Sequence, residues 1–270
     1  MAVAPTNLPN FAELITNPQS IAQLVKGRGW ASPLVHFLAP FAMRNFIYLP
    51  YEFHEATISP DFVVSNSAGT SAADFAVNSG VEGGTYKGDT GTDDNGSIQI
   101  NYESVMFDAA RNPGFEISML LDVVTGYAVE MSMCDAPTTA YTLNDSALTS
   151  GAVPTEVSNG VTDRASIIVN TDFTLGTAAL VSVGTTDTTE GGIALGTFLH
   201  TAATYSVWRL QVASRGAFGI IDDNVGQAAR LSAGPDTAVL MRPHVIVATK
   251  NTTAKFPEID YFRIWSERAY

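Results

Sequence analysis

The sequence predicts an all-β protein, folded as a two-sheet antiparallel sandwich and preceded by a short, partly helical arm. Roughly a dozen short segments after residue 50 are rich in β-branched and aromatic residues, and turn residues separate them. Helical spacing of apolar residues is almost absent from the same region. No repeat of about 20 to 50 residues is evident, which argues against a propeller or a solenoid.

The composition argues against several classes of partner. The chain has 270 residues and a formal net charge of -13, from 27 acidic and 14 basic residues. This acidic excess disfavours contact with a phosphate backbone, so we expect no nucleic-acid partner. No run reaches the roughly 20 apolar residues of a membrane helix, and the first residues lack the basic and apolar regions of a secretory signal. We therefore expect no membrane association and no export.

Residues 1–47 are predicted to form the arm, and residues 48–270 the sandwich. Helical spacing of apolar residues between positions 10 and 25 is interrupted by Pro18, which predicts a short helix, a break and a second helix ending near Gly27. The hydrophobic stretch after Trp30 is punctuated by prolines, so it is not one long helix.

The arm is too apolar to remain a free tail. It buries this surface either on its own domain or on a neighbouring subunit, and the sequence leaves both options open. The residues expected to make a subunit or shell contact are Phe11, Leu14, Ile15, Ile21, Leu24, Trp30, Phe37 and Phe41. Burial on another copy would make the protein a homo-oligomer.

The strands of the sandwich are predicted from runs of β-branched and aromatic residues between turn signals. The predicted segments are 53–58, 61–66, 84–87, 97–102, 114–124, 127–136, 164–170, 180–184, 204–214 and 216–223. Residues 68–96 are rich in loop-forming residues and hold only one or two short strands. Residues 97–102 alternate cleanly, so they are expected to be half-buried.

The end of the chain, residues 238–268, is predicted to form a final β-hairpin, around which the other predicted strands are arranged. Aromatic and β-branched residues occupy both faces of its second arm, and a strand of this kind is buried on both sides. We therefore expect the C-terminus to fill the middle of a sheet, with Tyr261 and Trp265 in the core. Trp208 lies in another apolar strand and is expected in the core as well.

Three segments, taken in sequence order, resemble a known family. They are VMFDAARNPGFEISMLLDVV, then TYSVWRLQVASRGAFGIIDDNVGQAARL, then LMRPHVIVATKNTTAKFPEIDYFRIWSER. Together they resemble the concanavalin A-like lectin/glucanase sandwich, a jelly roll, and more narrowly its versions in tailed-bacteriophage structural proteins. The motifs that carry the likeness are Trp208, the turn at residues 222–226 and the closing strand at residues 260–265.

The resemblance covers residues 50–268 approximately and implies a structural protein of a phage virion, made in the host cytoplasm. It implies a capsid decoration or head-associated protein that contacts a shell protein and other copies of itself, with a trimer favoured. The alternative is a carbohydrate-binding tail-fibre or receptor-binding module. A glycan site would use exposed aromatic residues, for which Tyr141, Tyr205 and Trp208 are candidates.

No enzyme motif is present, so we expect no catalytic residue. Glu116 and Asp122 share strand parity, yet six residues at about 3.3 Å each separate them by about 20 Å, which is too far for a two-carboxylate glycosidase. Glu130 and Asp135 are expected on opposite faces of one strand.

No cofactor is expected, apart from a calcium ion as the less favoured interpretation of one acidic loop. The loop contains Asp89, Asp93, Asp94 and Asn95, and the favoured interpretation is a solvated hairpin tip. The four histidines lack metal-binding spacing. The single cysteine, Cys134, is expected to be a small buried apolar residue.

Overall fold

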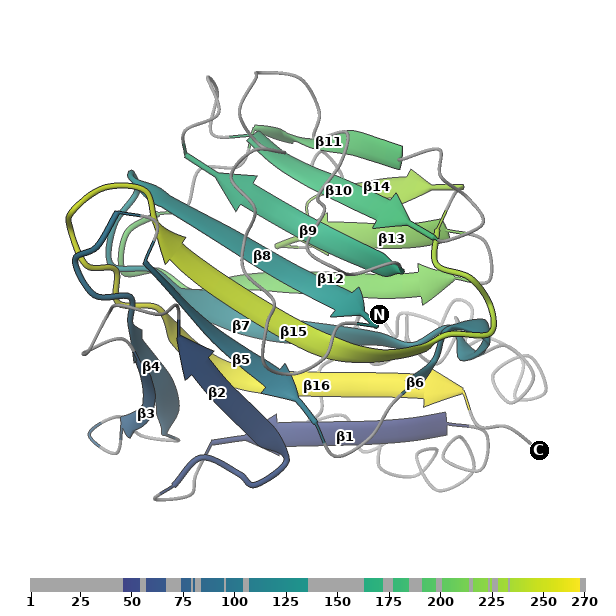
Figure 1. Ribbon diagram of the computed structural model, residues 1–270, viewed down its shortest axis with the longest axis horizontal. Helices are drawn as coiled ribbons and strands as arrows, with labels where there is room; N and C mark the ends of the chain where they lie inside the picture. Colours follow the sequence, from purple (N-terminus) through teal and green to yellow (C-terminus); the bar gives the residue numbers. More distant parts are fainter. Residues whose placement is uncertain are drawn as a thin grey trace, which may run out of the picture. The chain divides into compact units, whose positions relative to one another are not determined.

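The computed structural model describes most of the chain after residue 45 (Figure 1). The described residues are 46–53, 57–66, 74–78, 80, 84–94, 96–103, 107–135, 163–171, 177–184, 191–197, 201–213, 216–222, 224, 228–232 and 234–267. The chain divides into two compact units, and the larger, Leu49–Ser266, is a β-sandwich. Nearly all of the smaller unit, Met1–Tyr48 with Glu267–Tyr270, lies outside the described residues.

Two antiparallel sheets form the sandwich, which confirms the predicted all-β class (Figure 1). Sheet A has the order β14-β13-β12-β7-β16-β4-β3, and β1 pairs with β16 off this path. Its strands are β1 (Phe46–Glu52), β3 (Asp74–Asn78), β4 (Thr85–Asp89), β7 (Gly114–Leu120), β12 (Ser206–Ala213), β13 (Gly216–Ile221), β14 (Ala228–Leu231) and β16 (Glu258–Glu267).

Sheet B has the order β11-β10-β9-β8-β15-β5-β2, and β6 pairs with β15 off this path. Its strands are β2 (Phe62–Asn66), β5 (Ser97–Tyr102), β6 (Phe107–Asp108), β8 (Tyr127–Cys134), β9 (Arg164–Asn170), β10 (Thr177–Val183), β11 (Gly191–Thr197) and β15 (Leu240–Thr249). A single turn of 3₁₀ helix, η1 (Ala109–Arg111), follows β6 within the described part of the chain.

The core lies between the sheets, where alternate side chains of each strand meet. Trp208 of β12 is fully buried there, as predicted. Gly219 of β13 lies so close to sheet B that an added Cβ would be 3.0 Å from side-chain atoms of Ile167 and Leu180. A larger residue at this position would push the two sheets apart.

A cluster of aromatic rings joins the two sheets. Phe262 of sheet A lies 5.0 Å from Phe62 of sheet B and 6.0 Å from Phe115, measured between ring centroids. Phe53 stacks on Tyr86 with 3.5 Å between centroids. Because these rings bury large apolar areas, the cluster is a major part of what holds the sheets together.

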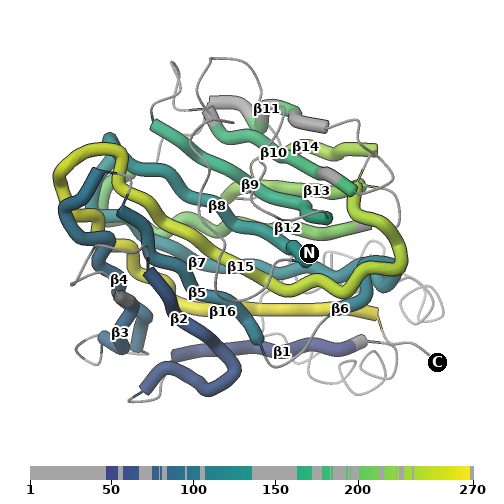
Figure 2. Tube along the Cα trace, in the orientation of Figure 1, coloured from purple at the N-terminus to yellow at the C-terminus, as the bar shows by residue number. Residues whose placement is uncertain are grey.

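The last two strands lie in the middle of the sandwich, but they do not form the predicted hairpin. β15 lies between β8 and β5 in sheet B, whereas β16 lies between β7 and β4 in sheet A. Figure 2 shows them in different layers, joined by the connection at the upper left. The prediction that the C-terminus fills the middle of a sheet is confirmed. The prediction that its two arms pair is wrong, because each arm pairs with strands of a different sheet.

A β-bulge in β16 changes which of its residues face the core. Ile259 pairs with Met119 and Tyr261 pairs with Ser118, so Asp260 is an extra residue without an opposite partner. Beyond the bulge, Phe262 and Ile264 are buried, whereas Tyr261 and Trp265 are half-buried on the outer face. The core placement predicted for Tyr261 and Trp265 is therefore corrected, since strict alternation missed the bulge.

Several predicted element bounds also need correction. Residues 46–52 form a strand, whereas the prediction placed it at 53–58. Residues 97–102 are buried throughout and not half-buried. The connection at residues 90–96 crosses from sheet A to sheet B, so it is not the tip of a hairpin. Strands β11 and β14 were not predicted, because their glycine- and alanine-rich sequences carry weak strand signals.

The predicted arm lies almost entirely outside the described residues. Its helices and its contact residues Phe11, Leu14, Ile15, Ile21, Leu24, Trp30, Phe37 and Phe41 all fall there, so these remain predictions.

Replacing Phe262 with alanine should lower the free energy of unfolding by about 3–5 kcal/mol, since the ring is fully buried at the junction of the sheets. Denaturant unfolding followed by tryptophan fluorescence measures this change. Val124→Ala is the control, because Val124 is 44% exposed and its loss should change stability by less than about 0.5 kcal/mol. A Phe262→Ala variant as stable as the control would contradict this account of the core.

Candidate functional site

The outer face of sheet A carries a row of charged residues in its central strands. Cross-strand pairing places Glu116 of β7 between Arg209 of β12 and Arg263 of β16. Since successive side chains point to opposite faces, these three residues lie opposite the buried row of Phe115, Leu210 and Ile264. The sheet thus has one apolar face and one polar face.

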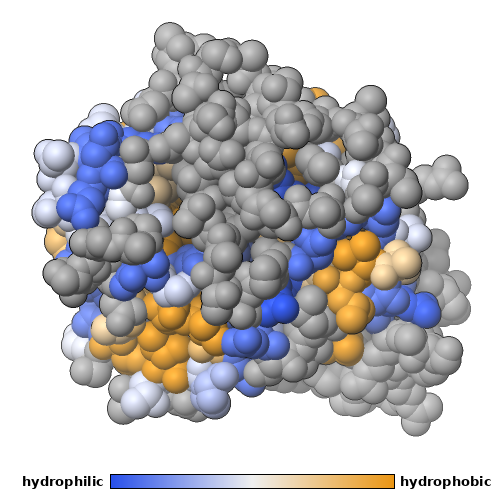
Figure 3. Space-filling model, in the orientation of Figure 1, coloured by the Kyte–Doolittle hydropathy of each residue, from blue (hydrophilic) through white to orange (hydrophobic). Residues whose placement is uncertain are grey.

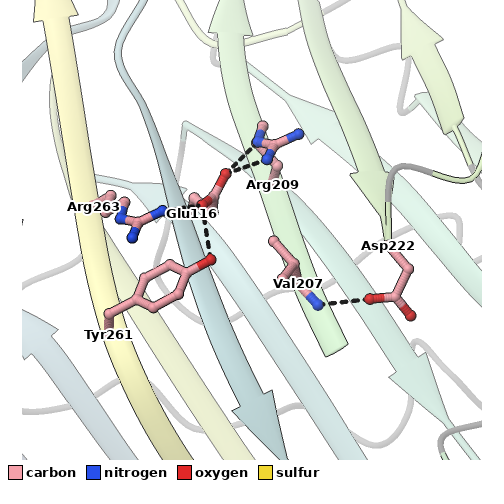
Figure 4. Close-up of polar contacts among 6 residues, drawn as sticks. All are labelled: Glu116, Val207, Arg209, Asp222, Tyr261 and Arg263. Atoms are coloured by element: carbon pink, nitrogen blue, oxygen red, sulfur yellow. Dashed lines mark hydrogen bonds and ion pairs between the residues drawn. The ribbon is translucent and has the colours of Figure 1, made fainter. Parts of the chain in front are cut away.

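Four side chains form what we term the Glu116 cluster: Glu116, Arg209, Tyr261 and Arg263 (Figure 4). One carboxylate oxygen of Glu116 accepts a hydrogen bond from Nε of Arg209 and forms an ion pair with its Nη2. The other accepts from the Tyr261 hydroxyl at 2.9 Å and from Arg263 Nη1 at 3.2 Å. Both oxygens are therefore committed to donors of the protein itself.

Electrostatics tie the cluster together. Arg263 stacks over the Tyr261 ring at 3.9 Å from its centroid, and its Nη2 lies 3.9 Å from a carboxylate oxygen of Glu52. Burial and the nearby Glu116 carboxylate raise the pKa of the Tyr261 hydroxyl, so it remains a donor to Glu116. A carboxylate held in this way is an anchor between strands and is poorly suited to act as a nucleophile or base.

A second group of side chains lies at the end of the same face, and we call it the Tyr205 site. It comprises Tyr205, Glu258, Asp260, Lys87 and Asn78. The Tyr205 hydroxyl donates to Glu258 Oε2 at 3.3 Å. Glu258 Oε1 lies 3.4 Å from Lys87 Nζ and accepts from Asn78 Nδ2 at 3.5 Å. Tyr205 is 39% exposed, and it is the one aromatic residue among the exposed large hydrophobic residues of the described chain.

Asp260 completes the Tyr205 site. It is the extra residue of the β-bulge and lies half-buried, two residues after Glu258 on the same face. Burial, followed by the charges of Glu258 and Asp260, raises the pKa of the Tyr205 hydroxyl to about 12. Both carboxylates thus act electrostatically on the same ring. Bulges commonly re-aim side chains next to functional sites.

The outer face of sheet B also carries polar side chains, but these are buried. Glu130 Oε1 accepts from Ser166 Oγ at 2.8 Å and lies 3.7 Å from Arg164 Nη1. The pair is almost inaccessible, with the side chains of Arg164 and Glu130 only 2% and 1% exposed. The contacts of Glu130 with Arg164 and Ser166 join β8 to β9, so they favour the observed pairing of these two strands.

A histidine chain lies on the same face of sheet B. His244 Nε2 lies 2.9 Å from Gln99 Oε1, and Gln99 Nε2 donates to Ser65 Oγ. Because an amide oxygen only accepts, Nε2 of His244 carries the hydrogen. Burial, with a smaller effect of the Arg242 charge, lowers the pKa of the His244 imidazole to about 3. His244 is therefore neutral at physiological pH.

The carboxylates considered for two-carboxylate catalysis have other roles. Strand β7 ends at Leu120, so Asp122 lies in a turn, where it accepts a hydrogen bond from the Phe256 backbone N–H at 2.9 Å. Asp135 lies just after β8, and its Oδ1 accepts from the Asp163 N–H at 3.2 Å. Both carboxylates therefore accept hydrogen bonds from backbone N–H groups next to strand ends.

The loop considered for calcium joins β4 of sheet A to β5 of sheet B. Asp89 Oδ1 accepts from the Gly91 N–H at 2.8 Å, which is an Asx-type turn. Asp93 and Asp94 are exposed, and Figure 3 shows hydrophilic residues gathered at this corner, at the upper left. In the described residues, no group of three or more His, Cys, Asp or Glu is placed to hold a metal ion. Asn95 lies outside them, so calcium stays an untested expectation.

The remaining predicted residues are placed as follows. Of the three candidates for a glycan site, Tyr205 is exposed, Trp208 is buried, and Tyr141 lies outside the described residues. Cys134 is buried, as predicted, and its Sγ lies 4.0 Å from Ser132 Oγ. Within the described part of the chain, no helix is long and apolar enough to cross a membrane. Sequence reasoning missed Glu258, Lys87 and Asn78 as neighbours of Tyr205, because they come from strands far apart in the chain.

Comparisons with known proteins identify the fold. No protein-family model matches the chain, and no curated protein matches its sequence. The carbohydrate recognition domain of Emp47p is similar in structure, with a TM-score of 0.55 and 11% identity over 83% of this chain and 97% of that chain.

Two further solved structures are similar. Lectin UEA-II, solved in complex with galactose, has a TM-score of 0.55 and 6% identity over 83% of this chain and 99% of that chain. A protein of unknown function from Shewanella oneidensis MR-1 has a TM-score of 0.54 and 14% identity over 90% of this chain and 98% of that chain. The sandwich is therefore of the concanavalin A-like, lectin type.

Replacing Glu116 with glutamine should lower the free energy of unfolding by about 1–3 kcal/mol, because two guanidinium groups would lose their shared counter-charge. The lower part of this range reflects the partial exposure of Arg209 and Arg263. Denaturant unfolding at neutral pH measures the loss. Glu103→Gln is the matched control, since it removes the same charge from an exposed position after β5. Equal stability of the two variants would show that the Glu116 cluster does not hold the strands.

The neutral state of His244 predicts a dependence of stability on pH. The folded pKa of about 3 lies below the ordinary value of 6.5, so the unfolded chain binds the proton first as the pH falls. This contribution is fully present above pH 6.5 and is lost toward pH 3. Lowering the pH from about 7 to about 5 should therefore lower the free energy of unfolding by about 2 kcal/mol. Most carboxylates stay ionised over this pH range, so they contribute little to the change.

Denaturant unfolding of the native chain and of His244→Gln across this pH range measures the effect. The variant should show a flatter dependence of unfolding free energy on pH, whatever its absolute stability. Parallel curves for the two proteins would mean that His244 does not titrate on unfolding in this way.

Proposed function

We propose that this protein is a non-catalytic carbohydrate-binding module and that the Tyr205 site is its binding surface. The observation that carries the proposal is the exposed Tyr205 ring beside the carboxylate, ammonium and amide groups of Glu258, Lys87 and Asn78. A sugar has an apolar C–H face and hydroxyl groups around its edge. An aromatic ring with polar groups at its rim complements both features.

The polar groups of the site offer both kinds of hydrogen bond. Glu258 supplies acceptors, while Lys87 and the Asn78 amide supply donors. The hydrogen bonds among these groups hold them in place before a ligand arrives, and pre-organised groups lose less entropy on binding. Lys87 also lies 5.9 Å from the centroid of the Phe256 ring, which adds a second aromatic surface beside the site.

The absence of catalysis is part of the proposal. On this face, Glu116 and Glu258 each contact several donors of the protein, so few of their lone pairs remain for a substrate. Screening for turnover of β-glucans, galactans and alginates tests this part. Turnover that disappears on changing one of these carboxylates would overturn it.

The structural neighbours support the choice of ligand class. Emp47p contributes a carbohydrate recognition domain and UEA-II was solved with galactose, although their low identities to this chain establish only the shared fold. Of the two functions weighed from the sequence, these neighbours favour the carbohydrate-binding alternative over capsid decoration.

The biological setting remains a prediction drawn from the phage resemblance. A carbohydrate-binding module in a phage virion would serve as a tail-fibre or receptor-binding element. The homo-oligomer, the trimer and the shell contact all depend on the arm, whose residues lie outside the described part of the chain. Localising the protein in an intact particle tests this setting: a few copies at a tail tip support it, whereas a shell covered by hundreds of copies supports decoration.

Replacing Tyr205 with alanine should weaken glycan binding about tenfold or more, since the main stacking surface is removed. A glycan array finds the ligand, and isothermal titration with that glycan measures the affinity. Tyr205→Phe should retain part of the affinity, because it keeps the ring and loses only the hydroxyl group.

Leu240→Ala is the control for this experiment. Leu240 is 53% exposed on β15, so the variant removes apolar surface from a strand of the other sheet. It should bind as the native chain does. Binding that survives Tyr205→Ala unchanged would place the site elsewhere, and the absence of binding to any glycan would refute the function.

A further inference from the structure

The charges around Tyr205 carry an inference about which glycans this site takes, and it rests on the function proposed above. Glu258 contacts the Tyr205 hydroxyl. Asp260 lies two residues further along β16 on the same outer face, since Ile259 between them is buried, and its charge also raises the pKa of that hydroxyl. Lys87 contributes one positive charge, against two negative charges from Glu258 and Asp260. The five side chains of the Tyr205 site thus have one positive and two negative formal charges, a sum of -1.

The neighbouring cluster does not reverse this balance. Arg209 and Arg263 contribute two positive charges, and Glu116 and Glu52 contribute two negative charges within the same set of contacts. The whole chain has a formal net charge of -13. An anionic ligand therefore meets repulsion both at long range and at the site.

Strand alternation gives Asp260 this position. Ile259 is buried, so Glu258 and Asp260 on either side of it both lie half-buried on the outer face. The bulge at Asp260 then turns Tyr261 to the same face. Two carboxylates of β16 thus lie on the face that carries Tyr205.

We propose that the Tyr205 site binds neutral glycans and rejects glycans that carry uronate groups, and that Asp260 is the residue that determines this specificity. A carboxylate of a ligand at this site would meet the like charges of Glu258 and Asp260, and like charges repel strongly in a partly desolvated site. A neutral sugar meets the same carboxylates as hydrogen-bond acceptors for its hydroxyl groups.

The test compares a neutral galactan oligosaccharide with an alginate oligosaccharide of the same length, titrated against the native chain, Asp260→Asn and Glu103→Gln. The native chain should prefer the neutral ligand by about tenfold or more. Asp260→Asn should reduce this preference about five- to tenfold by strengthening alginate binding, while galactan affinity changes less than about twofold. Glu103→Gln removes the same charge from a distant exposed position and should leave the preference unchanged.

A second measurement needs no variant. For the native chain, raising NaCl from about 0.05 M to about 0.5 M should shrink the preference for the neutral ligand, because salt screens repulsion between exposed charges. This result stands even if Asp260→Asn folds poorly.

The outcomes separate this inference from the function on which it rests. Binding of neither oligosaccharide refutes both. Binding of galactan and alginate with equal affinity, or a preference that Asp260→Asn and salt leave unchanged, overturns the specificity and leaves the carbohydrate-binding function standing. A preference that Glu103→Gln reduces equally would assign it to net charge and not to Asp260.

Discussion

The pairing of β16 with β7 in the middle of sheet A is the constraint on which the rest of the structure depends. One face of this pair carries Phe262 and Phe115 into the aromatic cluster that joins the two sheets. The other face carries Arg263 and Glu116, which tie β16, β7 and β12 together by hydrogen bonds. The same register thus sets the core and the polar outer face, because side chains alternate along each strand.

The bulge at Asp260 interrupts this register at one point, and its effects extend in both directions along β16. Toward the C-terminus, it turns Tyr261 outward, where the hydroxyl reaches Glu116. Toward the N-terminus, Glu258 remains on the outer face and contacts Tyr205. A single extra residue therefore separates the Glu116 cluster, which is saturated by internal contacts, from the more exposed Tyr205 site.

The two outer faces of the sandwich differ in a way that bears on function. On sheet B, polar side chains such as Glu130 and His244 are buried and bonded to other side chains. On sheet A, Glu116 is buried, but Arg209, Arg263 and Glu258 are half-buried and Lys87 is exposed. Tyr205 also presents an aromatic ring to solvent. Recognition of a ligand requires accessible groups, which is why we place the candidate site on sheet A.

The sequence by itself determined the all-β class, most strand positions and the burial of Trp208, because these follow from local alternation and from turn residues. It also marked Tyr205 as a candidate for sugar binding. Only the tertiary structure decided that β15 and β16 lie in different sheets, that Tyr261 and Trp265 face outward, and that Glu258 and Lys87 meet Tyr205. These features depend on long-range pairing and on one bulge, and local patterns carry no signal for either.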